Sequence, residues 1–502
     1  MTDRLTGWLV TLAVTAIAFV LRVVHLGRPD SLIFDETYYA KDAYSLLLFG
    51  YERSWPDDAN AKIIAGNVDV MRDSAAFIVH PQVGKWLIAL GEHFFGMNSV
   101  GWRVAPLIAG TLLVLVLTRL VRRVSRSTLI GGIAGLLLAF DGLAFVMSRV
   151  ALLDIFLAFF LLAAVACLAA DRDWFRNRLA DHLDRNGLAD LAGRFGPALI
   201  LRPWRIAAGV CFGLALGSKW SALYVLAAFA LLSLAWDVGA RRLAGAGIRS
   251  YTAILRDGLP AFVSLVLLSA VVYVSSWSSW LATTGGYDRD WGSKHPDAWT
   301  SRFLGDGLAS LIQYHKDIWG FHTGSYINHA THSYDAKPIG WLLIVRPLSM
   351  YYQGDLPAGS GCTGDKCVAA VLAIGTPLLW WVGVVALVAA VIFWVGARDW
   401  RFGIPVVGVL SVWLPWFSYD TRPVFYFYAI ALIPFTVMAV ALCLGKVIGD
   451  ARTGDRRMLG GVLAGAFVAL VAANFAWLYP ILSGQPITYA QWQARMWFRS
   501  WI

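Results

Sequence analysis

The sequence predicts an all-α integral membrane protein with about eleven transmembrane helices and two large external loops. Its 502 residues are 58% hydrophobic and only 15% charged, and the 24 tryptophans suit the interfacial belts of membrane proteins. Apolar runs of about 20 residues, the length that crosses a hydrocarbon core of roughly 30 Å, recur from end to end. The basic residues cluster in the links between these runs.

The basic links orient the chain, because short cytoplasmic loops carry an excess of Lys and Arg. Five such links and Arg4 can all be cytoplasmic if the chain alternates between the two sides, which puts the N-terminus inside and the C-terminus outside. The first run, "GWLVTLAVTAIAFVLRVVHLG", lacks a small-residue cleavage site and is interpreted as a retained span. The expected spans lie near residues 8–27, 101–120, 128–147, 150–170, 204–218, 220–237, 259–280, 371–395, 404–419, 424–444 and 459–479.

Two of the external links are long, at residues 28–100 and 281–370. Both are rich in Tyr, Trp, His, Asp and Gly, and loops of this length are usually functional. We treat residues 1–502 as a single membrane domain. The net charge of +10 does not indicate nucleic-acid binding, because the cations lie between spans and not along one surface.

The cysteines indicate one disulfide. Cys362 and Cys367, in "GCTGDKC", lie in the second external loop, where an oxidising compartment lets thiols pair. The alternative is half of a metal site, but no second Cys or His pair stands nearby at a suitable spacing. We therefore expect a disulfide and no metal site. The remaining cysteines lie in apolar spans as packing residues: Cys167, Cys211 and Cys443.

Three cations fall where the membrane rule does not explain them. Arg149, Lys219 and Arg422 each lie at an outer turn between two spans. Any one of them alone suits a snorkelling anchor at a helix end, but three at one face suit an anionic lipid headgroup. Asp154 faces an otherwise apolar helix, and we expect it to pair with Arg149, with direct substrate contact as the alternative.

The stretch "SLIFDETYYAKDAYSLLLFG" puts Asp35 and Glu36 on the same outer face, directly after the first span. Three interpretations of Asp35 are open. It caps a helix that lies in the membrane interface, it coordinates a cation in a transporter, or it acts as a general base toward an incoming hydroxyl. In the third case the nearby cations neutralise a departing lipid phosphate.

Six motifs, taken in order, resemble the protein O-mannosyltransferase family across nearly the whole chain. They are "FDETYYA", "HPQVGK", "SRVALLD", "GLALGSKWSALY", "HSYDAKPIGWLLIVRP" and "TRPVFYFYAIALIPF". The resemblance implies the GT-C fold of multispanning glycosyltransferases. It also implies transfer of mannose from a polyprenyl phosphate to Ser or Thr hydroxyls of proteins on the outer face.

The resemblance also implies roles for individual residues. Asp35 matches the catalytic acid of the family's Asp-Glu motif, and Glu36 matches its partner. His80 matches the His of a His-Pro-Pro pattern, although Gln82 replaces the second Pro. Arg149 matches an arginine important in the family, and Lys219 and Arg422 fall in the family's lipid-phosphate region. The substrate-binding candidates are His80, Lys85, Arg149, Asp154, Lys219, Arg346, Arg422 and Tyr426.

The loop at 281–370 is too short for the β-trefoil MIR domain of eukaryotic members, so the chain looks like a bacterial, actinobacterial-type member. We expect a single inverting displacement with Asp35 as the base. Glu36 is expected to position the sugar or acceptor, or to raise the basicity of Asp35 by like-charge proximity. No cofactor is expected to be required, and a divalent cation is not predicted.

The expected partners are polyprenyl-phosphate-mannose, membrane lipid and Ser/Thr-containing proteins met during or after secretion. Two alternatives stay open. A related lipid-linked glycosyltransferase would use the same residues on a glycan or lipid acceptor. A multispanning transporter is the second alternative, and inverted repeats with acids at the bilayer centre would favour it. The sequence shows neither feature, and a multi-pass protein of the bacterial plasma membrane with an extracytoplasmic active site is the expectation.

Overall fold

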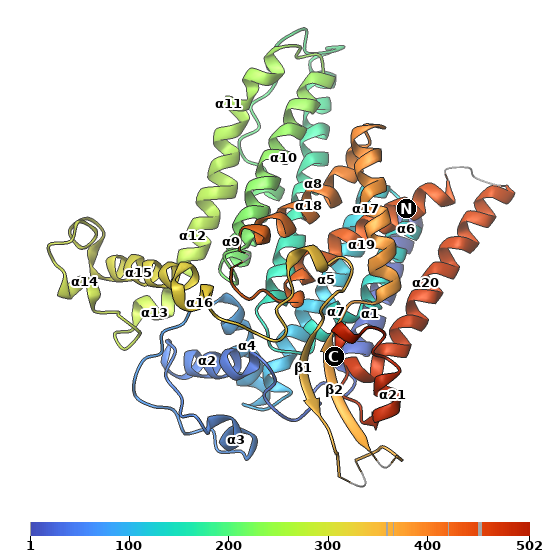
Figure 1. Ribbon diagram of the computed structural model, residues 1–502. Helices are drawn as coiled ribbons and strands as arrows, with labels where there is room; N and C mark the ends of the chain where they lie inside the picture. The colour runs from blue at the N-terminus through green and yellow to red at the C-terminus, as the bar shows by residue number, and fades with distance from the viewer. Residues whose placement is uncertain (1, 358–359, 365, 420, 450–453) are drawn as a thin grey trace.

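The computed structural model describes residues 2–357, 360–364, 366–419, 421–449 and 454–502, and it is mostly helical (Figure 1). Eight helical segments in these residues are long and apolar enough to cross a membrane. Three shorter apolar helices accompany them. Each of these segments lies at one of the expected spans. The long segments are α1 (Thr2–Val23), α5 (Gly101–Ser125), α8 (Asp154–Arg185), α10 (Ala222–Leu243), α11 (Arg249–Ala261) continued by η1 (Phe262–Leu267) and α12 (Leu268–Ser275), α17 (Pro377–Val395), η3 (Trp400–Phe402) with α18 (Gly403–Trp413) and η4 (Leu414–Tyr419), and α20 (Asp455–Leu482); the shorter helices are α6 (Thr128–Ala139), α9 (Pro203–Leu216) and α19 (Ile433–Ile448).

The third expected span, residues 128–147, is interrupted where Asp141 enters the bundle. Helix α6 ends two residues before Asp141, and α7 (Gly142–Met147) begins directly after it. The Asp141 carboxylate accepts hydrogen bonds from the Ala144 backbone N at 2.8 Å and from Trp380 Nε1 at 2.7 Å. Burying a carboxylate is costly unless donors surround it. The chain therefore breaks its helix at this residue to supply them.

A small antiparallel sheet, which the sequence analysis did not predict, lies at the end of the bundle. Its strand order is β1-β2-β3, formed by β1 (Leu348–Gln353), β2 (Cys367–Ala373) and β3 (Ile487–Thr488). The expected span at 371–395 thus begins as a strand, and helix α17 begins later. Every residue of β2 is buried, and a short continuous apolar run cannot be assigned to strand or helix by periodicity. The predicted disulfide joins Cys362 to Cys367, the first residue of β2.

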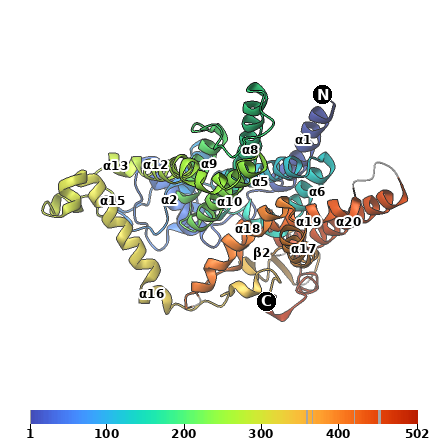
Figure 2. The same ribbon diagram turned by 90° about the horizontal axis from the view of Figure 1, so that it is seen from above.

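Several helices from residues 28–100 and 281–370 lie across one end of the bundle, at the bottom and left of Figure 1. We call this the loop end. There α2 (Glu36–Phe49) packs on α4 (Val83–Phe95), and α15 (Trp299–Thr323) projects beyond the bundle, as Figure 2 shows from above. The smaller elements are α3 (Ala59–Ile64), α13 (Ser278–Ala282), α14 (Trp291–Lys294), α16 (Ser325–Asn328), η2 (Pro338–Gly340), η5 (Tyr426–Ala431), α21 (Tyr489–Gln493) and η6 (Arg499–Trp501).

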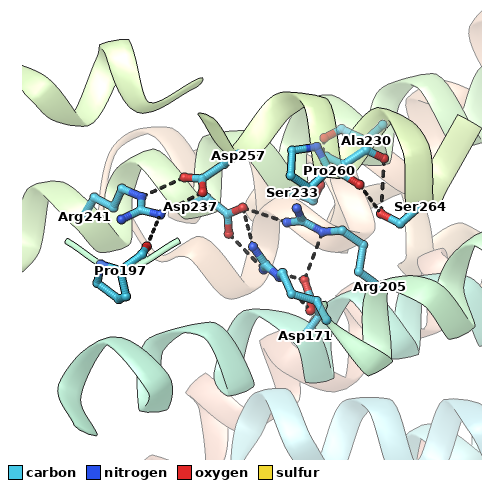
Figure 3. Close-up of polar contacts among 12 residues, drawn as sticks. Asp171, Pro197, Arg205, Ala230, Ser233, Asp237, Arg241, Asp257, Pro260 and Ser264 are labelled. Carbon is cyan, nitrogen blue, oxygen red and sulfur yellow. Dashed lines mark hydrogen bonds and ion pairs between the residues drawn. The ribbon is translucent and has the colours of Figure 1, made fainter. Parts of the chain in front are cut away.

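Buried ion pairs also hold α8, α9 and α10 together, and Figure 3 shows those around Asp237 in close-up. Arg202, directly before α9, pairs with both Asp171 on α8 and Asp237 on α10, and Arg205 pairs with the same two carboxylates. All four side chains are at most 2% exposed. Buried charges must be paired and hydrogen-bonded to be tolerated. The network therefore fixes the spacing of α8, α9 and α10.

We expect Asp237→Ala to destabilise the protein by about 3–5 kcal/mol, because it leaves two buried guanidinium groups with one carboxylate. Thermal unfolding of the purified protein in detergent measures the effect. The control is Asp181→Ala, which removes an exposed carboxylate 4.0 Å from Arg178. Equal melting temperatures for the two variants would contradict a stabilising role for the network.

Candidate active site

The three outlying cations lie at the loop end. Arg149 lies between α7 and α8, Lys219 between α9 and α10, and Arg422 between η4 and η5. Lys219 Nζ lies 2.9 and 2.8 Å from the two carboxylate oxygens of Asp154 at the start of α8. The expected pairing of Asp154 with Arg149 is therefore wrong. Asp154 neutralises Lys219 instead.

Arg149 ties the end of α1 to the turn before α8. Its guanidinium donates to the backbone carbonyls of Arg22, Val24 and His25 at 2.5, 2.7 and 2.7 Å. Carbonyls at the end of a helix have no partner within that helix, so Arg149 supplies one to Arg22, while the His25 carbonyl also accepts from the Arg28 backbone N at 3.0 Å. Arg149 is 4% exposed and is not among the residues that line the cavity described below. The guanidinium of Arg149 is therefore bound by backbone carbonyls of the chain.

Glu36 is bound by Arg103 of α5. Both of its carboxylate oxygens accept from Arg103 at 2.8 Å, and they also accept from the backbone N atoms of Ile33 and Ala151 at 3.0 Å. Glu36 and Arg103 are both fully buried. Glu36 thus anchors the segment that carries Asp35 to the bundle, and neither Glu36 nor Asp35 is among the residues that line the cavity described below.

Asp35 stands directly before α2, and its side chain makes no helix-capping hydrogen bond. The preceding residue, Phe34, has φ +46°, in the left-handed region that aromatic residues rarely adopt. The rings of Phe425 and Phe427 pack edge-on against Phe34, with centroids 5.9 and 5.6 Å away. Backbone outliers persist where the surrounding packing holds them. The turn at Asp35 is therefore held from two sides, by these rings and by the Glu36 anchor.

The electrostatic environment of Asp35 suits a general base. Burial raises the pKa of Asp35 to about 6, while the Lys219 ammonium opposes this rise and the Asp154 carboxylate adds to it. Glu36 is not among these causes, so the expected like-charge effect of Glu36 is not the source of the raised pKa. A carboxylate whose pKa lies near the working pH combines basicity with a large ionised fraction.

A cavity of about 500 Å³ adjoins Lys219 and has two kinds of wall. Lys219, Arg422 and the three histidines His80, His315 and His322 lie in its polar part. Segments α9, α10, η1, α12 and η4 form its apolar part, with Leu216, Leu223, Leu226, Val266, Ala270, Pro415 and Trp416. Such a cavity fits a ligand that is anionic at one end and hydrocarbon at the other.

Two of the three histidines in the polar wall, His80 and His322, have ring centroids 5.5 Å apart. Burial and the neighbouring cations lower the pKa of His80 well below its usual value, and burial lowers the pKa of His322. His80 was predicted from the sequence, whereas His322 and His315, one above the other on α15, were not. The signal was present in "YHKDIWGFHT", because residues seven apart share one face of a helix.

Lys85 and Gln82 fasten the first long loop. Lys85 Nζ lies 2.8 Å from Asp42 Oδ2 and 3.3 Å from Glu52 Oε1. Gln82 donates to Glu52 Oε2 at 3.1 Å and accepts from Ser279 Oγ at 3.4 Å. The residue that departs from the His-Pro-Pro pattern therefore links the first long loop to α13, and the structure puts Lys85 in buried ion pairs outside the cavity.

Two further candidates lie away from the cavity. Arg346 donates to the backbone carbonyls of Ser333 and Ser500, and Tyr426 OH accepts from the Gly375 backbone N at 3.2 Å while its ring packs on Trp380. Within the described ranges, no group of three or more His, Cys, Asp or Glu side chains converges as a metal site.

Comparison with known proteins matches both halves of the chain. Residues 12–179 match the model of the dolichyl-phosphate-mannose-protein mannosyltransferase family, and residues 308–501 match that of the C-terminal four-transmembrane region of protein-O-mannosyltransferase. The chain is 38% identical, over 99% of its length and 92% of the relative's, to the polyprenol-phosphate-mannose–protein mannosyltransferase of Mycobacterium tuberculosis. The chain belongs to the protein mannosyltransferase family.

Other similar proteins agree with this assignment of the family. The mannosyltransferase of the same name from Mycolicibacterium smegmatis is 38% identical, over 99% of this chain and 94% of that protein. The S. cerevisiae protein O-mannosyltransferase Pmt1-Pmt2 complex bound to the sugar donor superimposes with a TM-score of 0.72, over 99% of this chain and 92% of that one. At 14% identity this likeness concerns the fold, and it confirms the predicted GT-C architecture.

The Glu36–Arg103 pair of this mannosyltransferase can be tested through stability. We expect Glu36→Ala to lower the free energy of unfolding by about 3–5 kcal/mol, since it strands the buried Arg103 charge. Thermal unfolding in detergent is the measurement, and Asp57→Ala, at an exposed loop position, is the control. A Glu36→Ala protein as stable as this control would show that Glu36 is not an anchor.

Proposed function

We propose that this chain transfers mannose from polyprenyl-phosphate-mannose to Ser and Thr hydroxyls of proteins at the extracytoplasmic face of the bacterial plasma membrane. One observation carries the proposal. A carboxylate with a raised pKa, Asp35, lies within electrostatic reach of Lys219, a cation that lines an otherwise largely apolar cavity. The printed names of the actinobacterial relatives supply the sugar, the lipid and the protein acceptor.

The donor phosphate is proposed to bind between Lys219 and Arg422. The Nε atom of Arg422 is buried and has no hydrogen-bond partner among the described residues, so it can donate to a phosphate oxygen. Lys219 is held by Asp154 and lies 4.9 Å from the ring centre of Tyr428. The polyprenyl chain is proposed to extend from the phosphate along the apolar wall of the cavity, between α10 and α12.

Asp35 is proposed to act as the general base in a single displacement. It takes the proton of the acceptor hydroxyl as that oxygen bonds to the anomeric carbon of mannose. The bond from this carbon to the phosphate oxygen breaks at the same time, so the configuration inverts. The polyprenyl phosphate leaves with a negative charge that Lys219 and Arg422 neutralise. These groups complete the reaction, so no cofactor is proposed.

The orientation of the chain follows from the same proposal. The basic links that precede and follow the spans are cytoplasmic, and the loop end with Asp35 faces outside. Acceptor proteins therefore meet the site during or after secretion, and the donor arrives laterally within the membrane.

The decisive variant is Asp35→Asn, which keeps the size of the side chain but removes the base. We expect it to retain binding of the donor lipid and to lower the rate of mannose transfer about 10²- to 10⁴-fold. The assay uses purified full chain, polyprenyl-phosphate-mannose, an unmodified Ser/Thr peptide and, separately, a glycan acceptor, with a chelator present in a parallel series.

Each arm of this assay decides one part of the proposal. Full activity of Asp35→Asn would show that Asp35 is not the general base. Mannosylation of the glycan but not of the peptide would show that the acceptor is a glycan and not a protein. Loss of transfer in the chelator series would contradict a reaction without a metal. Peptide mannosylation by the wild type that persists with the chelator, and is lowered in Asp35→Asn while donor binding is retained, supports all three.

The raised pKa of Asp35 predicts an acid limb in the pH profile. A base must be ionised, so kcat/KM, which reports the free enzyme, should fall as the pH drops below about 6, where Asp35 takes up a proton. An unperturbed aspartate, with a pKa of about 3.9, would keep kcat/KM constant down to about pH 5. Steady-state kinetics from pH 5 to pH 8 distinguishes the two, and a flat profile would argue against Asp35 as the base.

A further inference from the structure

His322 contacts the proposed phosphate ligand Arg422, and the reaction proposed above gives it no role. Its Nδ1 lies 3.4 Å from Arg422 Nη1, and its Nε2 lies 3.0 Å from the backbone carbonyl oxygen of Val79. Its ring packs against His80 and, edge-on, against Trp220. The ring therefore bridges the first long loop and the turn that carries Arg422.

The partners of His322 determine which of its nitrogens carries the proton. A backbone carbonyl can only accept, so Nε2 must donate to Val79. A guanidinium can only donate, so Nδ1 must keep its lone pair to accept from Arg422. Both contacts exist together only in the neutral Nε2–H tautomer. Burial and the charges of Arg422 and Lys219 lower the pKa of His322, which favours this neutral form.

A second histidine on the same face of α15 steadies this arrangement. His315 Nδ1 lies 2.7 Å from the Leu311 carbonyl, and its Nε2 accepts from Tyr273 OH at 2.6 Å. Tyr273 in turn accepts from Trp220 Nε1 at 2.8 Å. This chain of contacts fixes Trp220 beside His322. The wall that holds the His322 ring is therefore a set of buried, partnered side chains.

The contact with His322 uses one end of the Arg422 guanidinium and leaves another donor unused. Nη1 faces His322, whereas the buried Nε has no partner among the described residues. A free arginine side chain samples many rotamers, and fixing it in advance lowers the entropic cost of binding an anion. We propose that neutral His322 is a positioning residue, which holds Nη1 of Arg422 so that Nε is presented to the donor phosphodiester. The inference rests on the proposed function, which places that phosphate at Arg422.

The test compares two substitutions that differ only in hydrogen bonding. His322→Leu removes both contacts. His322→Gln retains them, because an amide offers one donor for Val79 and one acceptor for Arg422. We expect His322→Leu to raise the KM and the Kd for polyprenyl-phosphate-mannose about ten-fold, equal to about 1.4 kcal/mol, with kcat close to that of the wild type. His322→Gln should return both constants close to the wild-type values.

Two controls separate positioning from general damage. His329→Leu changes an exposed histidine beyond the end of α16 and should leave donor binding unchanged. In an Arg422→Gln background, His322→Leu should have little further effect on the donor Kd, because coupled residues are not additive. Donor binding is measured directly on the purified full chain, so it does not depend on turnover.

Three outcomes would overturn the inference. These are an unchanged donor Kd in His322→Leu, a loss in His322→Gln as large as that in His322→Leu, and additive effects of the His322 and Arg422 substitutions. These results leave the proposed function standing if the wild type transfers mannose to the peptide. A wild-type chain that binds no polyprenyl-phosphate-mannose would instead overturn both.

Discussion

The loop end depends on the buried pair between Glu36 and Arg103. Arg103 belongs to a long helix of the bundle, and besides Glu36 it binds the backbone carbonyls of Leu26, Pro29 and Ser31. One guanidinium thus gathers the whole segment between the first helix and α2. Because a buried ion pair broken on one side is far more costly than an intact one, this segment has one stable position. The location of Asp35 follows from that position.

The same constraint explains how charges are distributed between structure and chemistry. Most of the unusual charges at the loop end bind other groups of the protein. The side chains of Glu36, Lys85 and Arg149 are each held by ion pairs or hydrogen bonds to protein atoms. Lys219 and Arg422 differ, since each keeps a side on the cavity. Asp154 binds Lys219 from outside this cavity, whereas His322 contacts Arg422 from within the same wall. Each of the two cations therefore has a protein partner and also faces the cavity.

The sequence predicted the helices and the shared face of the functional charges well, because both follow from the membrane. Alternating spans put Asp35, Lys219 and Arg422 at one end without any knowledge of packing. Ion-pair partners were harder to predict. Asp154 pairs with Lys219 and not with Arg149, although Arg149 is nearer in sequence. Asp35 and Glu36 were interpreted as a functional pair, but residues adjacent at a helix start point about 100° apart. The strand β2 was hidden because a buried apolar run has no periodicity.

The size of the cavity has a consequence for which lipids the protein can use. At about 500 Å³ it matches a drug-sized molecule, so only the part of a long polyprenol nearest the phosphate fits inside. Under the proposed function, the remainder of the tail would lie in the bilayer, outside this cavity. Donor binding would then depend little on isoprenoid chain length beyond the first units. The membrane would decide which carrier is used, by which one it contains.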